Sequence, residues 1–213
     1  MSRESKTSLE VDRDFSNKLK VIEMLFLLDV DIAGSKKPYD RSLFKYGNTD
    51  EDGDCMRVRH EVLARDSLLE VRLSERSSPC TVQVTGGQWL SLYDNAVTDD
   101  PDTLQIDHIV SLKEAWISGA SLWSDEKLEQ FGNDLGFEGS LIAVTSKLNG
   151  MAEKGDKDPK RWLPDFNKCQ FAQNYVAVKY RWGLSVDQAE RDVLVNLLNG
   201  KCGDQIVDVS TAP

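Results

Sequence analysis

"TLQIDHIVSL", residues 103–112, holds one of the two histidines of this 213-residue chain in an otherwise largely apolar stretch. Its pattern predicts a β-strand that ends near His108, and "GSLIAVTS" at 139–146 predicts a second strand. Neighbouring side chains of a strand point to opposite faces, so Asp107 and His108 can serve one metal site only where the strand ends or kinks. The alternative is a buried histidine that is hydrogen-bonded to a neighbour.

Helical patterns lie on both sides of these strands. Apolar periodicity and end signals predict helices at about 15–28, 56–69, 111–120, 124–135, 158–164, 167–182 and 185–200. Ser124 can cap the fourth of these helices, and Ser185 with Gln188 forms a capping box for the last. The expected buried stripes are Leu19, Ile22, Leu25 and Phe26 in the first helix and Ala189, Val193 and Leu197 in the last.

The predicted fold class is α+β, with strands gathered in the middle third of a mostly helical single domain. "CTVQVTGGQWLSLYD" at 80–94 alternates on both sides of Gly86-Gly87, which is the pattern of a β-hairpin with a primed turn. The composition is 40% hydrophobic, enough for a core. We expect one domain over residues 15–203, between a flexible N-terminus at 1–14 and a flexible tail at 204–213.

Charge is unevenly distributed along the chain. The formal net charge of −10 argues against a protein that coats nucleic acid through its overall field. Residues 141–182, however, contain eight Lys and Arg against four Asp and Glu. Within them, "KLNGMAEKGDKDPKRWLP" at 147–164 carries five basic side chains. A solvated charged loop is one interpretation of this segment, and a local surface for phosphates is the other.

The four cysteines and the termini bear on localisation. Cys55, Cys80, Cys169 and Cys202 lack zinc-site spacing. Their order suggests the pairs Cys55–Cys80 and Cys169–Cys202, which need an oxidising compartment, whereas a cytosolic protein would keep four buried thiols. The N-terminal residues show no signal peptide, and no stretch of 18 apolar residues predicts a membrane helix. Localisation therefore stays open, and we expect no membrane partner.

Together the middle segments contain the groups needed for metal-assisted hydrolysis of a phosphodiester. Mg²⁺ prefers a few oxygen ligands from protein, which Asp107 and Asn149 would supply. A neutral imidazole removes a proton from water near neutral pH, so His108 is the candidate general base. Lys154 would stabilise the charge that grows on the phosphate. The expected cofactor is one divalent cation, Mg²⁺ or alternatively Mn²⁺.

Several segments, in order, resemble one family. They are "YDRSLF", "DEDGDCMRVRHEVLARDS", "LQIDHIVSLKEAWISGASLW", "FGNDL", "LIAVTSKLN", "KGDKDPKRWLP" and "VKYRWGLSVDQAE". This pattern is similar to the HNH nuclease family related to the C-terminal domain of GmrSD-type restriction enzymes, which includes secreted bacterial and fungal members. The resemblance covers roughly residues 18–202. It implies a ββα-metal core, in which two strands and a helix hold one divalent cation.

The resemblance also implies roles for individual residues. His108 becomes the base, Asp107 and Asn149 the metal ligands, and Lys154 a phosphate contact. Arg57 and Arg65 match arginines of the upstream motif and are expected to bind substrate or to brace the site, and Lys157 is expected to bind substrate. Salt bridges to Glu61 or Asp66 are the alternative for the arginines. The positions of Cys55, Cys80, Cys169 and Cys202 also look like those of the family, which favours oxidised pairs and secretion.

The chain departs from the family pattern at two places. The family Asn usually lies three residues before the Lys of "KGDKDP", whereas Asn149 lies five before Lys154 and Met151 occupies the usual position. Methionine is a poor Mg²⁺ ligand. Alignment on "LIAVT" keeps Asn149 as the ligand and makes the loop two residues longer, and we prefer this register because a loop absorbs an insertion. Ser111 replaces the usual Pro.

We expect a metal-dependent endonuclease that acts on DNA, with RNA as an alternative substrate. The competing hypothesis is a catalytically inactive HNH-like module that binds a partner, and Met151 with its longer loop motivates it. The sequence contains no nucleophile elbow, no phosphate-binding P-loop and no dinucleotide fingerprint. It does not predict an oligomeric state.

Overall fold

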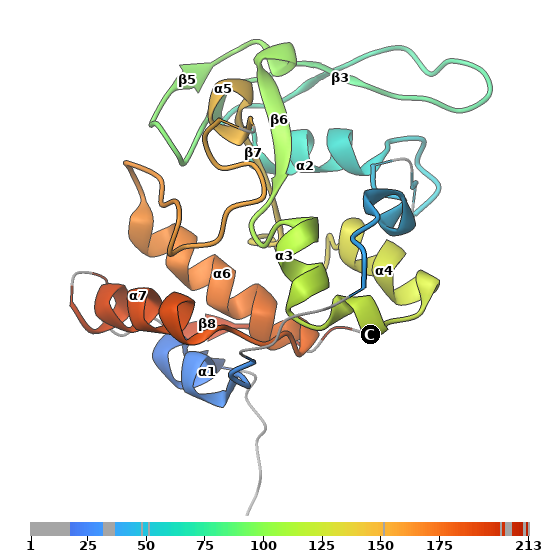
Figure 1. The fold of residues 1–213 in the computed structure, drawn as a ribbon. Coiled ribbons are helices and arrows are strands. Elements are labelled where there is room, and N and C mark those ends of the chain that lie inside the picture. Colours follow the sequence, from blue (N-terminus) through green and yellow to red (C-terminus); the bar gives the residue numbers. More distant parts are fainter. Residues whose placement is uncertain are drawn as a thin grey trace, which may run out of the picture.

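The computed structural model describes residues 18–31, 37–47, 49–50, 52–150, 152–200, 202, 206–210 and 212. These residues form an α+β fold in which paired strands lie among helices, as predicted (Figure 1). The N-terminus expected to be flexible, residues 1–14, lies outside the described residues, as does Met151.

The two strands predicted around the Asp-His pair are confirmed, and they form the centre of the fold. β6 (Leu104–His108) pairs antiparallel with β7 (Leu141–Thr145), from Leu104 opposite Thr145 to His108 opposite Leu141. Leu141 and Ala143 of β7 pack with the smaller apolar cluster, whereas Ile142 and Val144 pack with the larger one. Because both faces of β7 are covered, side-chain alternation holds this pair of strands firmly in register. α5 (Ser146–Asn149) follows directly.

Helices cover this pair of strands on the side of the larger cluster. α6 (Lys168–Trp182) is the most extensively buried of them, and α1 (Val21–Leu27) and α7 (Gln188–Asn199) pack against it. α6 ends at Gly183 in the left-handed conformation, which favours glycine. α3 (Leu112–Ile117) begins after Ser111 and α4 (Asp125–Gly132) after Ser124, and each serine side chain caps its helix. The cap predicted at Ser124 is confirmed.

The buried faces of the first and last helices differ from the prediction. α1 buries Val21, Met24 and Leu25, while Phe26 is 55% exposed. α7 is capped by Asp187 and Glu190, and it buries Glu190, Leu194 and Leu198. The Ser185 hydroxyl donates instead to the carbonyl oxygen of Ser118, 3.0 Å away. That tertiary contact takes up the predicted cap, so Asp187 caps the helix instead. Packing against α1 and α6 determines which stripe of the helix points inward.

The hairpin predicted at residues 80–94 is wrong. β3 (Val84–Gly86) pairs with β2 (Arg72–Leu73), and β4 (Trp89–Leu90) pairs with β5 (Val97–Thr98). Gly86-Gly87 therefore connects two hairpins. A side-chain carbon added at Gly86 would lie 2.0 Å from the guanidinium of Arg72, so this glycine permits a close approach and not a turn.

Three further segments depart from the predicted elements. Residues 158–164 form a single turn, because only the amides of Arg161 and Trp162 bond back to the Asp158 carbonyl. In the tail expected to be flexible, β8 (Ile206–Asp208) pairs with β1 (Lys18–Lys20). The helix predicted at 56–69 is shorter, as α2 (Val58–Asp66). Single 3-10 turns lie at Arg41–Phe44, Pro101–Thr103 and Ala120–Leu122.

Both cysteine pairs suggested by the sequence order form in the structure. Cys55 bonds to Cys80 and Cys169 to Cys202, with Cα atoms 5.1 and 5.0 Å apart. The first pair ties the loop before α2 to the β2–β3 hairpin, and the second ties α6 to the residue after α7. No helix in the described part of the chain is long and apolar enough to cross a membrane.

Candidate active site

The geometry around His108 determines which of its nitrogens can accept a proton. β6 ends at this residue, and its Nε2 lies 2.9 Å from the carbonyl oxygen of Gly132, the last residue of α4. A carbonyl oxygen only accepts, so Nε2 carries the hydrogen and Nδ1 keeps its lone pair. The ring is held between Phe131, stacked at 6.4 Å, and the edge of Tyr46 at 5.5 Å. The imidazole is thus fixed in one tautomer and one orientation.

Burial lowers the pKa of His108 to about 4. This pKa is the net result: the hydrogen bond to Gly132 opposes the effect of burial, and the positive charges of Lys154 and Arg41 add to it. His108 is therefore neutral at pH 7, which is the protonation state that a general base needs.

Asp107 faces a different set of groups from His108. Its Oδ1 accepts from Lys154 Nζ at 2.9 Å, and its Oδ2 accepts from the same ammonium at 2.8 Å and from the Tyr93 hydroxyl. Burial raises the pKa of Asp107, and Lys154 and then Tyr93 lower it. Because the strand ends here, Asp107 and His108 still line one hollow, as the prediction required.

Lys154 does not occupy the position expected of a phosphate contact. Its side chain is 0% exposed, and it also donates to the carbonyl oxygen of His108 at 2.7 Å. A fully buried ammonium with these partners has no surface to offer a phosphate. Lys154 holds Asp107 and the end of β6 in place.

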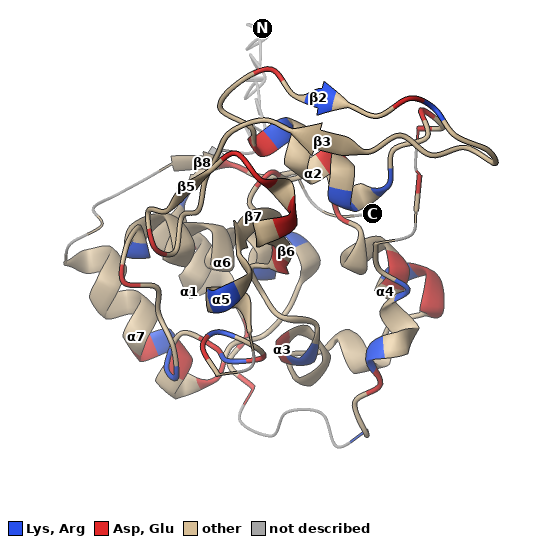
Figure 2. Cartoon of the chain, turned by 90° about the horizontal axis from the view of Figure 1, so that it is seen from above, with Lys and Arg blue, Asp and Glu red and all other residues tan. Residues whose placement is uncertain are grey.

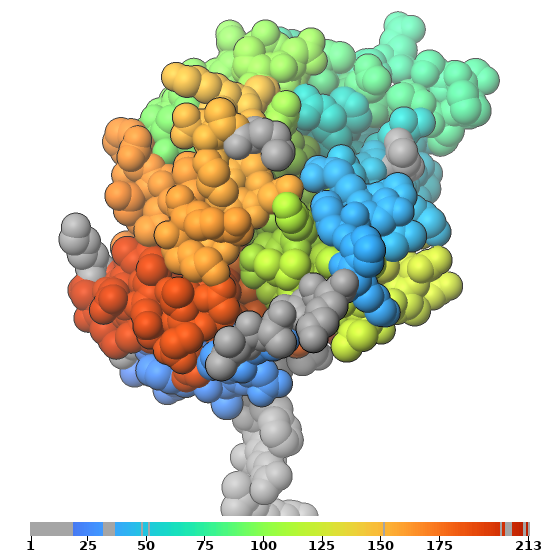
Figure 3. Space-filling view, viewed as in Figure 1, coloured from blue at the N-terminus to red at the C-terminus, as the bar shows by residue number. Residues whose placement is uncertain are grey.

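Two adjoining hollows, of about 390 and 300 Å³, meet at His108 and form what we call the cleft. Both are lined by a shared group of residues, which are Arg41, Gln105, Ile106, His108 and Asn149. In Figure 3 the segments of residues 37–47 (blue) and 146–166 (orange) lie on either side of the green residues of β6 and α3. Asn149, the last residue of α5, borders both hollows, where the preferred register expected it.

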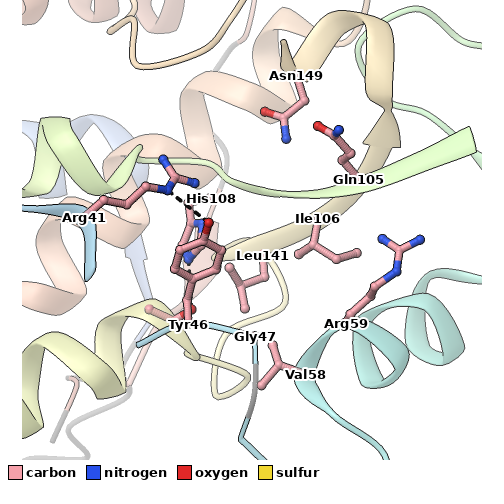
Figure 4. A pocket seen from close by; sticks show the side chains of 11 residues that line it. Arg41, Tyr46, Gly47, Val58, Arg59, Gln105, Ile106, His108, Leu141 and Asn149 are labelled. Carbon is pink, nitrogen blue, oxygen red and sulfur yellow. Dashed lines mark hydrogen bonds between the residues drawn. The ribbon is translucent and has the colours of Figure 1, made fainter. Parts of the chain in front are cut away.

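Two arginines that the sequence analysis did not select line the cleft. Arg41 lies over the ring of Tyr46 at 4.8 Å, and its Nε donates to the Tyr46 hydroxyl at 3.0 Å (Figure 4). Arg59 donates to the carbonyl oxygens of Leu104 at 3.1 Å and Pro101 at 2.9 Å. Both arginines belong to segments that resemble the family, Arg41 to "YDRSLF" and Arg59 to "DEDGDCMRVRHEVLARDS". The direction of the Arg59 side chain depends on the turn before β6, which local sequence does not reveal.

The residues expected to bind substrate do not line the cleft. Arg57 precedes α2 as its N-cap residue. Arg65 bonds to the carbonyl oxygen of Leu141 and, at 2.7 Å, to Asp66, whose other oxygen accepts from the amide of Ala143. Arg65 thus braces β7, and the predicted alternative of a salt bridge with Asp66 is confirmed. Lys157 Nζ donates to the carbonyl oxygen of Ala152 at 2.8 Å.

The basic segment of residues 141–182 is mostly neutralised within the fold. Asp107 binds Lys154, Asp158 binds Lys160 and Arg161, Asp134 binds Arg181, and Glu114 and Glu190 bind Lys179. Acidic and basic residues are interspersed along the elements in Figure 2. The predicted concentration of positive charge therefore serves packing more than a basic surface.

Side chains with oxygen atoms, the donor type that a hard divalent cation prefers, line the smaller hollow. Asp107, Asn149, Ser111 and Asp156 offer oxygen atoms there, beside His108. Asp107 Oδ1 has the Lys154 ammonium as its hydrogen-bond partner and, as a carboxylate oxygen, keeps a lone pair. Oxygen donors with room for waters are what Mg²⁺ prefers, and Mn²⁺ accepts the same set.

A comparison with protein families matches the part of the chain that carries Asp107, His108 and Asn149. A family profile described as "GmrSD restriction endonucleases, C-terminal domain" matches residues 59–197. A protein of Arthroderma benhamiae named "Uncharacterized secreted protein" is 35% identical over 174 residues, which cover 81% of this chain and 80% of that protein. No solved structure matches the chain significantly.

Proposed function

The chain belongs to the family of C-terminal domains of GmrSD restriction endonucleases, and from this premise we propose that it is an HNH-type endonuclease. It would hydrolyse phosphodiester bonds of DNA, with RNA as an alternative substrate, beside one divalent cation. The observation that carries the proposal is the orientation of His108. Its Nε2–H is committed to the Gly132 carbonyl, so Nδ1 is the nitrogen that can accept a proton, and the residue lines the same hollow as Asp107 and Asn149.

The order of elements supports an HNH core. β6, β7 and α5 contact one another, and they carry Asp107, His108 and Asn149 at their ends. Two antiparallel strands followed by a helix are the ββα arrangement that the sequence resemblance implies. β6 and β7 are antiparallel, so His108 at the end of β6 pairs with the start of β7, while α5 follows the other end of the pair. His108 and Asn149, 41 positions apart in sequence, nevertheless both line the cleft.

In the proposed mechanism, His108 removes a proton from the water that attacks the phosphorus atom. Asp107 and Asn149 would hold the cation, which when bound supplies Lewis-acid stabilisation of the phosphate charge. Lys154 and Tyr93 hold the Asp107 carboxylate in position through their hydrogen bonds. Arg41, which borders both hollows, takes the part expected of Lys154 and donates to the phosphate oxygens.

We also infer that the protein is secreted. The two disulfides are typical of oxidising compartments, and the A. benhamiae relative is named as a secreted protein. This localisation would place the nuclease where extracellular nucleic acid is available.

A plasmid-nicking assay tests the nuclease proposal. The purified protein is incubated with supercoiled plasmid in Mg²⁺, Mn²⁺ or EDTA, beside the variants His108→Ala and His60→Ala. His60 is the matched control, because it is the other histidine and accepts from the Val84 amide away from the cleft. We expect metal-dependent nicking that falls at least about 100-fold in His108→Ala and persists in His60→Ala. Unchanged nicking by a folded His108→Ala variant would contradict the proposal.

A second candidate function is a binding module without catalysis. The observation that favours it is that both oxygens of Asp107 already accept hydrogen bonds, from Lys154 and Tyr93. Absence of nicking in Mg²⁺, Mn²⁺ and Ca²⁺, with an unchanged circular dichroism spectrum, would support this candidate over the nuclease.

A further inference from the structure

The larger hollow of the cleft has a guanidinium group at each end. Arg41 enters from the 3-10 turn Arg41–Phe44 and Arg59 from α2, and Figure 4 shows them on opposite sides of the hollow, with Ile106 and Leu141 between them. His108 lies on the Arg41 side. A substrate that fills this hollow would therefore meet one arginine beside the general base and a second arginine farther along.

Both guanidinium groups are held by protein contacts that leave donors unused. Arg41 uses its Nε on the Tyr46 hydroxyl, and Arg59 uses its two terminal nitrogens on the carbonyl oxygens of Leu104 and Pro101. A guanidinium carries five N–H donors, so each group can still donate to an anionic oxygen. Since these contacts already orient the planar groups, little rotamer entropy remains to be lost on phosphate binding.

The bottom of the hollow between the arginines is apolar. Val58 and Leu141 are almost fully buried, at 4% and 1% exposed, and the partly exposed Ile106 of β6 supplies the accessible apolar surface. Such a floor does not match a sugar–phosphate backbone, which is polar throughout. It matches the face of a nucleobase, which is flat and packs on apolar or aromatic side chains. The volume of about 390 Å³ lies in the range of pockets that take one small ligand.

We propose that the larger hollow binds one unpaired nucleotide next to the scissile phosphate. Its base packs on Ile106, the scissile phosphate lies at Arg41 beside His108, and the neighbouring phosphate lies at Arg59. A base within a duplex is paired and stacked on both sides, so it enters this hollow only after it leaves the helix, which costs free energy that an unpaired base does not spend. The preferred substrate is therefore single-stranded nucleic acid. This inference rests on the proposed function and names its substrate class.

The experiment measures binding separately from cleavage. Fluorescence anisotropy follows a labelled 15-nucleotide DNA strand, and the duplex of the same sequence, titrated with the protein in EDTA at several salt concentrations. The variants are Arg41→Ala and Arg59→Ala. Arg191→Ala is the matched control, because it removes the same charge from α7, where the guanidinium lies over Phe26 at 5.1 Å.

We expect the single strand to bind at least about tenfold more tightly than the duplex. Arg41→Ala and Arg59→Ala should each weaken that binding about tenfold and lower the slope of log affinity against log salt by about 0.7, the value for one phosphate contact on a single strand. Arg191→Ala should change the affinity less than about twofold. A duplex that binds as tightly as the strand, or arginine variants that behave like Arg191→Ala, would overturn the subsite.

The two proposals fail in different ways. Strand binding with the expected arginine effects, together with no cleavage of either the plasmid or the labelled strand in Mg²⁺ or Mn²⁺, would overturn the nuclease and support the subsite. Nicking that depends on His108 without any effect of Arg41 or Arg59 on strand binding would overturn the subsite alone.

Discussion

Two fully buried lysines have similar partners in two different places. Lys154 bonds to Asp107, which also accepts from the Tyr93 hydroxyl; we call these three residues the cleft cluster. The core cluster, between α3, α6 and α7, has the same chemistry with one more carboxylate. Its members are Lys179, Glu114, Glu190 and Tyr175. Each tyrosine has its pKa raised well above its ordinary value, mainly by burial.

The two clusters differ in whether one of their carboxylates borders a cavity. Lys179 donates to Glu114, Glu190, the Ser118 hydroxyl and the carbonyl oxygen of Ser185, all in the interior. Asp107 of the cleft cluster, in contrast, borders the cleft. The comparison teaches that a buried lysine–carboxylate–tyrosine set is a structural clamp when enclosed. The same set becomes a candidate site when its carboxylate reaches a cavity, because only then can a further ligand approach.

Lys179→Met should have the largest effect. The substitution keeps the approximate volume but leaves Glu114 and Glu190 buried without a cation, and the expected loss is about 5 kcal/mol in the free energy of unfolding. Urea denaturation measures it, with the exposed Lys168→Met as control. A loss below about 1 kcal/mol would mean that the core cluster does not clamp the three helices.

Lys154→Met should cost less, about 3 kcal/mol, because it leaves one buried carboxylate, that of Asp107, without a cation, whereas Lys179→Met leaves two. Adding Mg²⁺ to both variants tests whether the carboxylate of each cluster is accessible to a cation. A cation that enters the cleft can compensate Asp107, so part of the stability should return, whereas Lys179→Met should gain nothing. If Mg²⁺ restored both variants or neither, the distinction between an enclosed and an accessible carboxylate would fail.

The depressed pKa of His108 predicts a pH dependence that the core cluster does not share. A histidine with a pKa of about 4 in the folded state and 6.5 in the unfolded chain binds protons more readily when unfolded. Stability is therefore complete above pH 6.5 and falls as pH drops toward 4, by about 2 kcal/mol between pH 7 and 5. Urea denaturation in EDTA at both pH values measures the fall, and His108→Asn should reduce it.

Removal of one hydroxyl from each cluster should have the smallest effect on stability. Tyr93→Phe and Tyr175→Phe each delete a hydrogen bond to a carboxylate, at about 1–2 kcal/mol. Their effects on function should differ: Tyr93→Phe loosens Asp107 and should slow plasmid nicking, while Tyr175→Phe should not. Equal nicking rates of the two variants would contradict the positioning role of Tyr93.

Much of the fold could be predicted where the signal is local. The strands at 104–108 and 141–145, the helix at 168–182 with its glycine end, and the serine cap at Ser124 depend on periodicity and on hydrogen bonds between near neighbours. The predictions failed where a contact with a residue far away in the sequence determines the local structure. Ser185 was expected to cap a helix, but its hydroxyl bonds to Ser118, 67 residues away. Gly86 was expected to form a turn, but it makes room for Arg72.

The same distinction between local and distant signals applies to the residues of the candidate site. The sequence by itself determined the residue types: the Asp107-His108 pair at a strand end, Asn149 after the next strand, and the order of the four cysteines. Only the tertiary structure decided which lysine and arginine side chains line the cleft. Lys154 is buried against Asp107, Arg65 braces β7, and Arg41 and Arg59 line the hollow. The physical reason is that periodicity assigns a side chain to a face of its own element, whereas its ion-pair partner depends on elements packed from elsewhere in the chain.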